Sequence, residues 1–266
     1  MKTVSELSNL SDRTALVTGG AGGVAEAIAM SLSEMGCHVV LTDRDVDPLN
    51  ARVEQIRSAG GKASAIAVDL LDEKNALPQL DEVIAKTNGL DILVNNAAFV
   101  GTSNLQGWGV PFEQQDPNLW KDVLELNLTV PFRLTQHFHK QLASKGWGSV
   151  INISSIYGLL GPDQRLYSGT EMGNPAAYGA SKGGLIQLTR WLATSIAPSV
   201  RVNTIGLGGI ERGQPESFQE AYVERTPLQR MGNEEDIKGA IGYLASDLSR
   251  YVTGQLIMVD GGWSAW

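Results

Sequence analysis

The sequence predicts an α/β fold: a doubly wound, seven-stranded parallel sheet with helices on both faces. Seven short apolar runs, rich in β-branched residues, recur along the chain. Segments of helical length, with apolar residues at three- and four-residue spacing, separate these runs. Strands that are apolar throughout are typical of a parallel sheet covered on both faces, and alternation with helices gives the crossovers that parallel strands need.

The elements use nearly the whole chain. The predicted strands are 14–18, 38–42, 63–68, 91–94, 149–153, 201–205 and 255–259. The predicted helices are 23–35, 48–59, 73–87, 118–144, 176–196 and 233–246. Since no linker, repeat or low-complexity tract separates them, we expect one domain over residues 1–266.

Composition limits the classes of partner. Of the 266 residues, 42% are hydrophobic, which is enough for one large core, and the formal net charge of −8 argues against a nucleic-acid partner. No window approaches the roughly 18 to 20 apolar residues of a membrane-spanning helix. The N-terminal sequence has no apolar run typical of a signal peptide, and the single cysteine, Cys37, cannot form an internal disulfide. We therefore expect a cytoplasmic protein that acts on a small-molecule substrate. We expect it to have no nucleic-acid, membrane or metal partner.

A glycine-rich turn follows the first predicted strand. The segment "LVTGGAGGVAEAIA" (16–29) also opens the first predicted helix. In this context Gly19 permits a tight bend, while Gly22 and Gly23 let backbone N–H groups approach a pyrophosphate at the helix N-terminus. The motif predicts a dinucleotide site; the alternative is a glycine-rich turn without a ligand.

Two acidic residues end the next strands. Asp43 lies about 20 residues beyond the glycine turn, where a carboxylate can accept hydrogen bonds from an adenosine ribose. This favours NAD, although the adjacent Arg44 could partly neutralise the carboxylate, so NADP is not excluded. The alternative for Asp43 is a solvated charge. Asp69 is placed to meet an adenine ring and, equally, to cap the helix that follows.

Tyr178 and Lys182 lie four residues apart, on one face of a predicted helix. Hydride transfer between a carbinol carbon and a nicotinamide needs a group that exchanges a proton with the alcohol oxygen. A phenol is too weak a base unless its phenolate is stabilised, and a nearby ammonium lowers a phenol's pKa. We predict Tyr178 as the acid/base and Lys182 as its activator. The alternative is a core tyrosine beside a solvated lysine.

Further motifs occur in a fixed order. They are Thr18, Gly19, Gly23 and Ala25 in a T-G-x-x-x-G-x-G pattern, "NNAA" (95–98), "LELNLTVPF" with Asn127, "VINISSIYG" with Ser155, and the closing "YLASD…YVTGQLIMVDGG". On these motifs, the chain from about residue 12 to the C-terminus resembles the short-chain dehydrogenase/reductase family, whose fold is the Rossmann fold. Two family glycines are alanine in this chain, at positions 25 and 98.

The resemblance implies further roles. Lys182 also holds the nicotinamide ribose, and the backbone carbonyl of Asn127 holds a water on the proton path. Ser155, rather than Ser154, hydrogen-bonds the substrate oxygen as charge develops on it. The implied cofactor contacts are Gly19, Gly22, Gly23, Val24, Asp43, Arg44, Asp69, Leu70, Asn96, Ala97, Ala98, Tyr178, Lys182, Gly208, Gly209 and Ile210. A homotetramer is also implied.

The chain departs from the family pattern in two places. Ser155 and Tyr178 are 23 residues apart, more than the family usually has, and the additional residues lie within 161–173. After the sixth strand, Leu207 replaces a proline, and Arg212 lies near the position of a threonine that binds the nicotinamide carboxamide. Because an arginine can hold a carboxylate bidentately, we hypothesise that Arg212, together with Arg165, binds an anionic group of the substrate. The alternative is a surface or subunit contact.

The segment 208–232 is predicted to be a mobile substrate lid. The alternative is a solvated loop with a short helix at "ESFQEAYVER". Trp263 and Trp266, near the C-terminus, are expected to be exposed and to mark a subunit contact unless other residues cover them.

The sequence therefore predicts an oxidoreductase that transfers hydride between NAD(P) and a secondary alcohol or ketone. The insertion and the "VDGGWSAW" ending resemble short-chain dehydrogenases of bacterial surface-sugar modification, including flagellin glycans, which suggests a sugar or sugar-acid substrate. One alternative is an NADPH-dependent 3-oxoacyl-carrier-protein reductase, against which Asp43 argues. Another is a non-catalytic nucleotide-binding regulator, against which Tyr178 and Lys182 argue.

Overall fold

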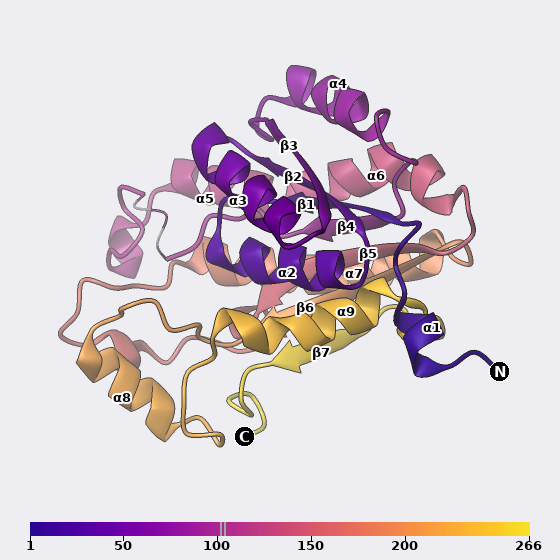
Figure 1. Ribbon diagram of the computed structural model, residues 1–266. Coiled ribbons are helices and arrows are strands. Elements are labelled where there is room, and N and C mark those ends of the chain that lie inside the picture. Colours follow the sequence, from indigo (N-terminus) through magenta and orange to yellow (C-terminus); the bar gives the residue numbers. More distant parts are fainter. Residues whose placement is uncertain (102, 104) are drawn as a thin grey trace.

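The computed structural model describes residues 1–101, 103 and 105–266. A seven-stranded parallel sheet runs through the molecule in the order β3-β2-β1-β4-β5-β6-β7 (Figure 1). The strands are β1 (Thr14–Thr18), β2 (His38–Asp43), β3 (Lys62–Ala67), β4 (Ile92–Asn95), β5 (Gly148–Ser155), β6 (Val200–Leu207) and β7 (Leu256–Val259). The predicted doubly wound sheet is confirmed, with strand ends within two residues of the predicted ones.

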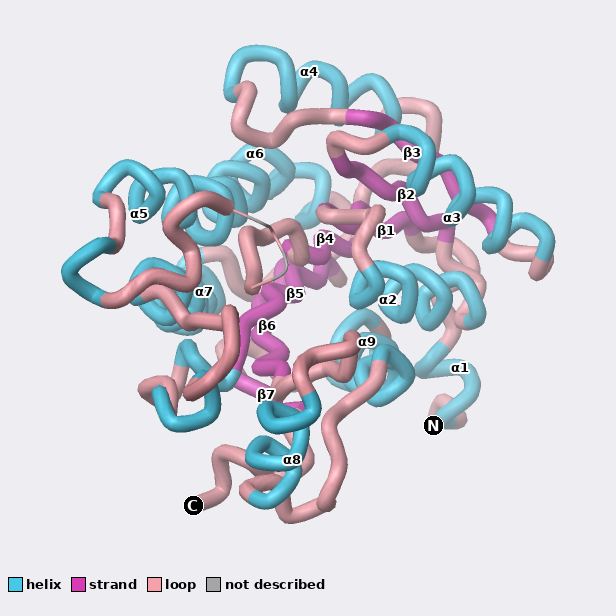
Figure 2. The backbone as a smooth tube through the Cα atoms, turned by 90° about the vertical axis from the view of Figure 1, so that its left-hand side faces the viewer, coloured by secondary structure: helices cyan, strands magenta, loops and turns pink. Residues whose placement is uncertain are grey.

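Helices cover both faces of the sheet (Figure 2). They are α1 (Val4–Ser8), α2 (Gly23–Glu34), α3 (Val46–Ser58), α4 (Glu73–Ile84), α5 (Pro117–Leu124), α6 (Val130–Ala143), α7 (Ala176–Ser195), α8 (Glu216–Glu224) and α9 (Lys238–Ala245). One core cluster joins the sheet to α2, α3 and α9, and a second joins it to α4, α6 and α7. Successive strand residues serve the two clusters in turn: Leu16 packs in the second and Val17 in the first, as the period of a strand requires.

The prediction of one continuous helix over 118–144 is wrong because the helix is interrupted. A π-helical turn, η2 (Glu125–Thr129), separates α5 from α6. Pro131 has no N–H to donate to the carbonyl of Asn127 four residues earlier, so a regular α-helical turn cannot form there. The helix irregularity therefore falls at Asn127, one of the predicted site residues.

A third apolar cluster lies beyond the carboxyl ends of β5 and β6. It joins Leu166 of the insertion, Phe218 and Tyr222 of α8, and Trp263 near the C-terminus. The short helix considered for the segment after the sixth strand is confirmed as α8. Trp263 is only 3% exposed, which is the covered case that the prediction allowed, because Tyr222 stacks on its ring and Arg225 lies over it. Trp266 is 76% exposed, as predicted.

Candidate active site

The carboxyl ends of the parallel strands meet along one edge of the sheet, and the strand order reverses between β1 and β4. In open α/β sheets, a crevice forms at such a switch point. Gly19 follows β1 here with a positive φ of 69°, and a methyl group added to it would lie 2.8 Å from the Cα of Ala97. Only glycine suits this position. The Thr18 hydroxyl, accepting from the amides of Asn96 and Ala97 at 3.0 Å each, fixes the two strand ends together.

Asp43 braces the glycine turn. Its carboxylate accepts from the backbone N–H of Ala21 at 3.1 Å and from that of Arg44 at 2.7 Å. It is only partly buried, so the side chain has accepting capacity left for a ligand. Asp69 is exposed and accepts from the amide of Leu71 at 3.0 Å, whereas the cap of α4 is Asp72. The helix-cap alternative for Asp69 is therefore wrong.

Two adjoining cavities open at this edge. The first, of about 390 Å³, is lined by the predicted nucleotide residues on the first strands: Gly19, Gly22, Gly23, Val24, Asp43, Arg44, Asp69, Leu70, Asn96, Ala97 and Ala98. The second, of about 450 Å³, is lined by six other predicted residues: Ser155, Tyr178, Lys182, Gly208, Gly209 and Ile210. Val24, Asn96, Ala98 and Arg212 line both, so the two cavities are contiguous.

The predicted acid/base pair lies in the second cavity. Tyr178 and Lys182 are on α7, and Ser155 is the last residue of β5. The Lys182 ammonium donates to the carbonyl of Ile153 at 2.8 Å and lies 5.8 Å from the centre of the Tyr178 ring. Glycines at 179, 183 and 184 keep this part of α7 close to its neighbours; a methyl at Gly183 would lie 3.2 Å from the Gly158 carbonyl.

Burial dominates the ionisation of both groups. It raises the pKa of Tyr178, a hydrogen bond from Ser155 partly counteracts this, and the neighbouring Tyr167 adds to the rise. Burial also lowers the pKa of Lys182 to about 8. Desolvation of the phenolate is the main cause of the raised pKa of Tyr178, and the lowering of that pKa by the Lys182 ammonium stays a prediction.

The neighbouring polar groups are held in place. The Asn127 side chain accepts from the N–H of Phe99 at 2.8 Å and donates to the Ser181 hydroxyl at 3.1 Å, so its amide serves structure. The Ser154 hydroxyl donates to the backbone carbonyl of Lys182 at 2.9 Å. The Ser155 hydroxyl accepts from the backbone N–H of Tyr157 at 3.2 Å and, of the two candidate serines, is the one that lowers the pKa of Tyr178.

The two predicted arginines separate. Arg212 lies beside the glycine turn: its guanidinium pairs with Glu234 at 3.1 Å, and a methyl added at Gly23 would lie 3.4 Å from it. Arg165 pairs with Asp163, has a side chain 88% exposed, and is not among the described residues that line either cavity. The prediction that both arginines face the substrate is wrong for Arg165, because the adjacent carboxylate turns it outward.

Several cavity residues were not named individually from the sequence, although all but Tyr157 lie in the segments 96–112, 158–175 and 207–230 that were expected to build the substrate pocket. They are Trp108, Tyr157, Tyr167, Asn174, Phe218 and Tyr222. Tyr157 follows Ser155 by two residues and Tyr167 lies in the insertion, so their positions offered a signal. Trp108, which packs edge-on against Tyr178 with ring centres 6.0 Å apart, lies in an irregular segment that gave none.

The residues present fit a dinucleotide with a nicotinamide end. The glycine turn leaves the N-terminus of α2 open to a phosphate, since Gly22 and Gly23 carry no side chain there. Lys182 uses one of its three protons on a described residue, which leaves two for ribose hydroxyls. Within the described ranges, no three His, Cys, Asp or Glu side chains form a cation site, and no helix combines the length and apolarity needed to cross a bilayer.

A parallel sheet with a glycine turn at its switch point and a half-buried tyrosine and a buried lysine beside it defines a dinucleotide-dependent oxidoreductase. A family model described as enoyl-(acyl carrier protein) reductase matches residues 19–264. A 3-oxoacyl-[acyl-carrier-protein] reductase from Aquifex aeolicus is 32% identical over 95% of this chain and 98% of its own. The cis-4-hydroxycyclohexanecarboxylate dehydrogenase of Sinomonas cyclohexanicum is 31% identical over 96% and 97%.

A crystal structure of a gluconate 5-dehydrogenase from Burkholderia cenocepacia, in complex with NADP and tartrate, superposes with a TM-score of 0.87 at 26% identity, covering 99% of this chain and 100% of its own. The chain belongs to the short-chain dehydrogenase/reductase family. It is therefore an enzyme that moves hydride between NAD(P) and an alcohol or ketone.

Proposed function

We propose that the chain interconverts the secondary alcohol of a small hydroxy acid and the corresponding keto acid. The observation that carries this proposal is the sharing of one cavity by Ser155, Tyr178 and Arg212. The first two suit an alcohol or carbonyl oxygen, and a guanidinium suits a carboxylate. Of the relatives, the Sinomonas and Burkholderia enzymes are named for substrates that carry both groups.

Tyr178 exchanges the proton with the substrate oxygen, and Ser155 holds that oxygen while charge develops on it. When bound, the nicotinamide supplies or accepts the hydride. Since burial raises its pKa, the Tyr178 phenol is protonated at neutral pH and set to donate to a ketone. Lys182 holds the nicotinamide ribose and passes the proton onward past the Asn127 carbonyl.

Asp43 supports NAD over NADP. A carboxylate beside the glycine turn can accept from both ribose hydroxyls and repels a 2′-phosphate. The exposed neighbour Arg44 moderates that repulsion, so NADP binds more weakly rather than not at all. Titration of protein fluorescence with NADH and NADPH measures the preference.

The protein is further proposed to be a single-domain cytoplasmic homotetramer. Large aromatic side chains are exposed on α5, α6 and α7, at Trp120, Phe132 and Trp191. Exposed aromatics on adjoining helices are typical of subunit contacts.

The test compares turnover of D-gluconate, cis-4-hydroxycyclohexanecarboxylate and cyclohexanol, which lacks a carboxylate, with NAD⁺ and NADP⁺. We expect Arg212→Ala to lower kcat/KM for the acids about 10- to 100-fold, the value of one charge-assisted pair, and to leave cyclohexanol unchanged. Arg165→Ala is the matched control, since that arginine lies outside the cavities. An equal loss on cyclohexanol, with weaker NADH binding, would assign Arg212 to the cofactor instead.

The carrier-protein reductase remains the second candidate, because the Aquifex relative is one. Faster turnover of a 3-oxoacyl thioester with NADPH than of any hydroxy acid would favour it.

A further inference from the structure

The inserted segment 161–173 forms one wall of the substrate cavity. Tyr167 lies at the end of η4 (Gln164–Tyr167), and with Met172, Gly173 and Asn174 it lines the same cavity as Tyr178. Its phenol is close enough to raise the pKa of Tyr178. The insertion therefore contributes one wall of this cavity, while other residues of it, such as Arg165, face the solvent.

A pair of phenols defines this wall. The hydroxyls of Tyr157 and Tyr167 lie 2.7 Å apart, and the Asn174 amide donates to that of Tyr167 at 3.4 Å. Two phenols carry two protons, and their mutual hydrogen bond uses one. The other proton has no acceptor among the described residues, whichever phenol carries it.

The wall is rigid. Leu166 is buried beside Tyr167. The Tyr167 ring packs on the ring of Phe218 in α8, with the ring centres 5.6 Å apart. Asp163, which begins η4, forms an ion pair with Arg225, and that guanidinium lies 4.8 Å from the Trp263 ring. Contacts from three separate segments thus hold the two rings, so the free proton stays on one of two phenol oxygens at this wall.

We propose that the Tyr157–Tyr167 pair is a specificity-determining subsite that donates a hydrogen bond to a hydroxyl of the substrate remote from the reacting carbon. The substrate class is then a polyhydroxy acid, held by Tyr178 and Ser155 at the reacting carbon, by Arg212 at the carboxylate and by the phenol pair between or beyond them. This inference rests on the proposed function and narrows it. A site that pairs a buried donor with a substrate hydroxyl rejects an analogue lacking that hydroxyl, because the donor stays unpaired.

The test uses two acids: D-gluconate, which carries several hydroxyls, and cis-4-hydroxycyclohexanecarboxylate, which has only the reacting one. Either phenol alone can still donate, so the decisive variant is Tyr157→Phe with Tyr167→Phe. We expect kcat/KM for gluconate to fall at least tenfold relative to the cyclohexane acid, mainly through KM, with NADH affinity and Tm retained. The single variants show which phenol bonds the substrate, and the exposed Tyr251→Phe is the matched control.

Three results would overturn the inference. Unchanged kcat/KM values for both acids would show that the phenols do not contact the hydroxyl. An equal loss on both acids would show that they only maintain packing. Failure of the unmodified enzyme to turn over either acid would overturn the proposed function itself, and the subsite with it.

Discussion

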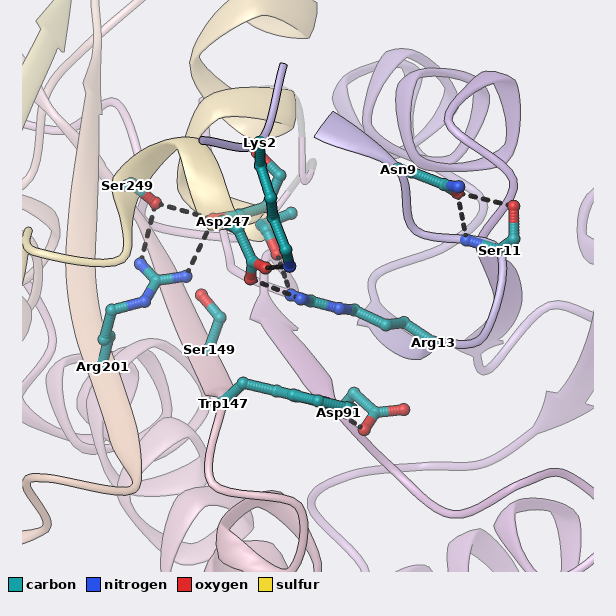
Figure 3. Close-up of polar contacts among 12 residues, drawn as sticks. Lys2, Asn9, Ser11, Arg13, Asp91, Trp147, Ser149, Arg201, Asp247 and Ser249 are labelled. Atoms are coloured by element: carbon teal, nitrogen blue, oxygen red, sulfur yellow. Dashed lines mark hydrogen bonds and ion pairs between the residues drawn. The ribbon is translucent and has the colours of Figure 1, made fainter. Parts of the chain in front are cut away.

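At the amino ends of the strands the buried charged groups are fully partnered, whereas at the carboxyl ends several buried polar groups are not. Figure 3 shows the amino edge, where Arg13 pairs with Asp247 and lies 5.2 Å from the centre of the Trp147 ring. Arg201 donates to the Ser249 hydroxyl at 2.8 Å and to a backbone carbonyl at 2.9 Å. These groups have their partners within the chain.

The carboxyl edge differs. The buried Lys182 ammonium has one described acceptor, and the indole N–H of Trp108, a side chain 7% exposed, has none among the described residues. Burial shifts the pKa of both Tyr178 and Lys182 against their charged forms. Leaving buried polar groups unpaired costs stability.

The contrast assigns different roles to the two edges. At the amino edge, the ion pair of Arg13 with Asp247 offsets the cost of burying that guanidinium, and hydrogen bonds hold Arg201, although burial still lowers the pKa of Arg201 to about 10. At the carboxyl edge the cost stays until a ligand supplies the missing partners, as is common at binding sites. Changes at the first edge should therefore affect stability, and changes at the second should affect activity.

The largest expected effect is that of Tyr178→Phe. It removes the proton donor but keeps the ring against Trp108, so kcat/KM should fall by about 10³ to 10⁴ while Tm stays within a degree or two. Steady-state rates and thermal melts on the same preparation check both. Because NADH binding does not need the phenol, a normal NADH titration guards against misfolding. A variant with near-normal rates would remove Tyr178 from the chemistry.

The next largest effect is expected at the amino edge. Asp247→Ala leaves the Arg13 guanidinium buried without its charged partner, which costs about 3 kcal/mol. Urea unfolding should show this loss as a lower free energy of unfolding. The kcat/KM measured at about 20 °C, well below the melting temperature, should be unchanged. The exposed Asp12→Ala serves as control and should change neither. A loss of activity in the folded Asp247 variant would contradict the separation of the two edges.

The fold was predictable because strand and helix periods are local properties of the sequence, and the site partly followed from it. Once β2 and β5 were placed, Asp43 and Ser155 fell at their carboxyl ends, which meet at one edge in any parallel sheet. Tyr178 and Lys182 followed from the spacing of a helix. These positions depend on register along the chain and not on the shape of a loop.

The features that the sequence did not predict depend on contacts between segments that are distant along the chain. Arg165 and Arg212 looked alike in sequence, yet one pairs with Asp163 and the other with Glu234, at the cleft. The burial of Trp263 depends on α8, and the Arg13–Asp247 pair joins opposite ends of the chain. The raised pKa of Tyr178 was missed because desolvation depends on packing, which no residue spacing reveals.

The smallest expected effect on stability is that of replacing Lys182, where stability and activity should change in opposite directions. Burial lowers the pKa of Lys182 from 10.5 to about 8, so the unfolded chain binds more protons than the folded one between these values. This group therefore makes stability rise with pH from about 8 to 10.5, and below pH 8 it destabilises the fold. Lys182→Met should abolish most activity yet raise stability at pH 7 by about 1 kcal/mol, or roughly 2 to 4 °C in Tm, after the lost hydrogen bond to Ile153 is counted.

The contribution of Lys182 to the pH dependence of stability is the difference between the unfolding free energies of the unmodified protein and of Lys182→Met. The other groups titrate in both proteins, so their contributions cancel. The stability of the unmodified protein relative to Lys182→Met should rise as pH goes from about 8 to 10.5, until the unmodified protein is the more stable of the two, and the exposed Lys86→Met should show no such trend. If Lys182→Met instead melts below the unmodified protein at pH 7, then Lys182 stabilises the fold as Arg13 does, and the two edges of the sheet treat buried charge alike.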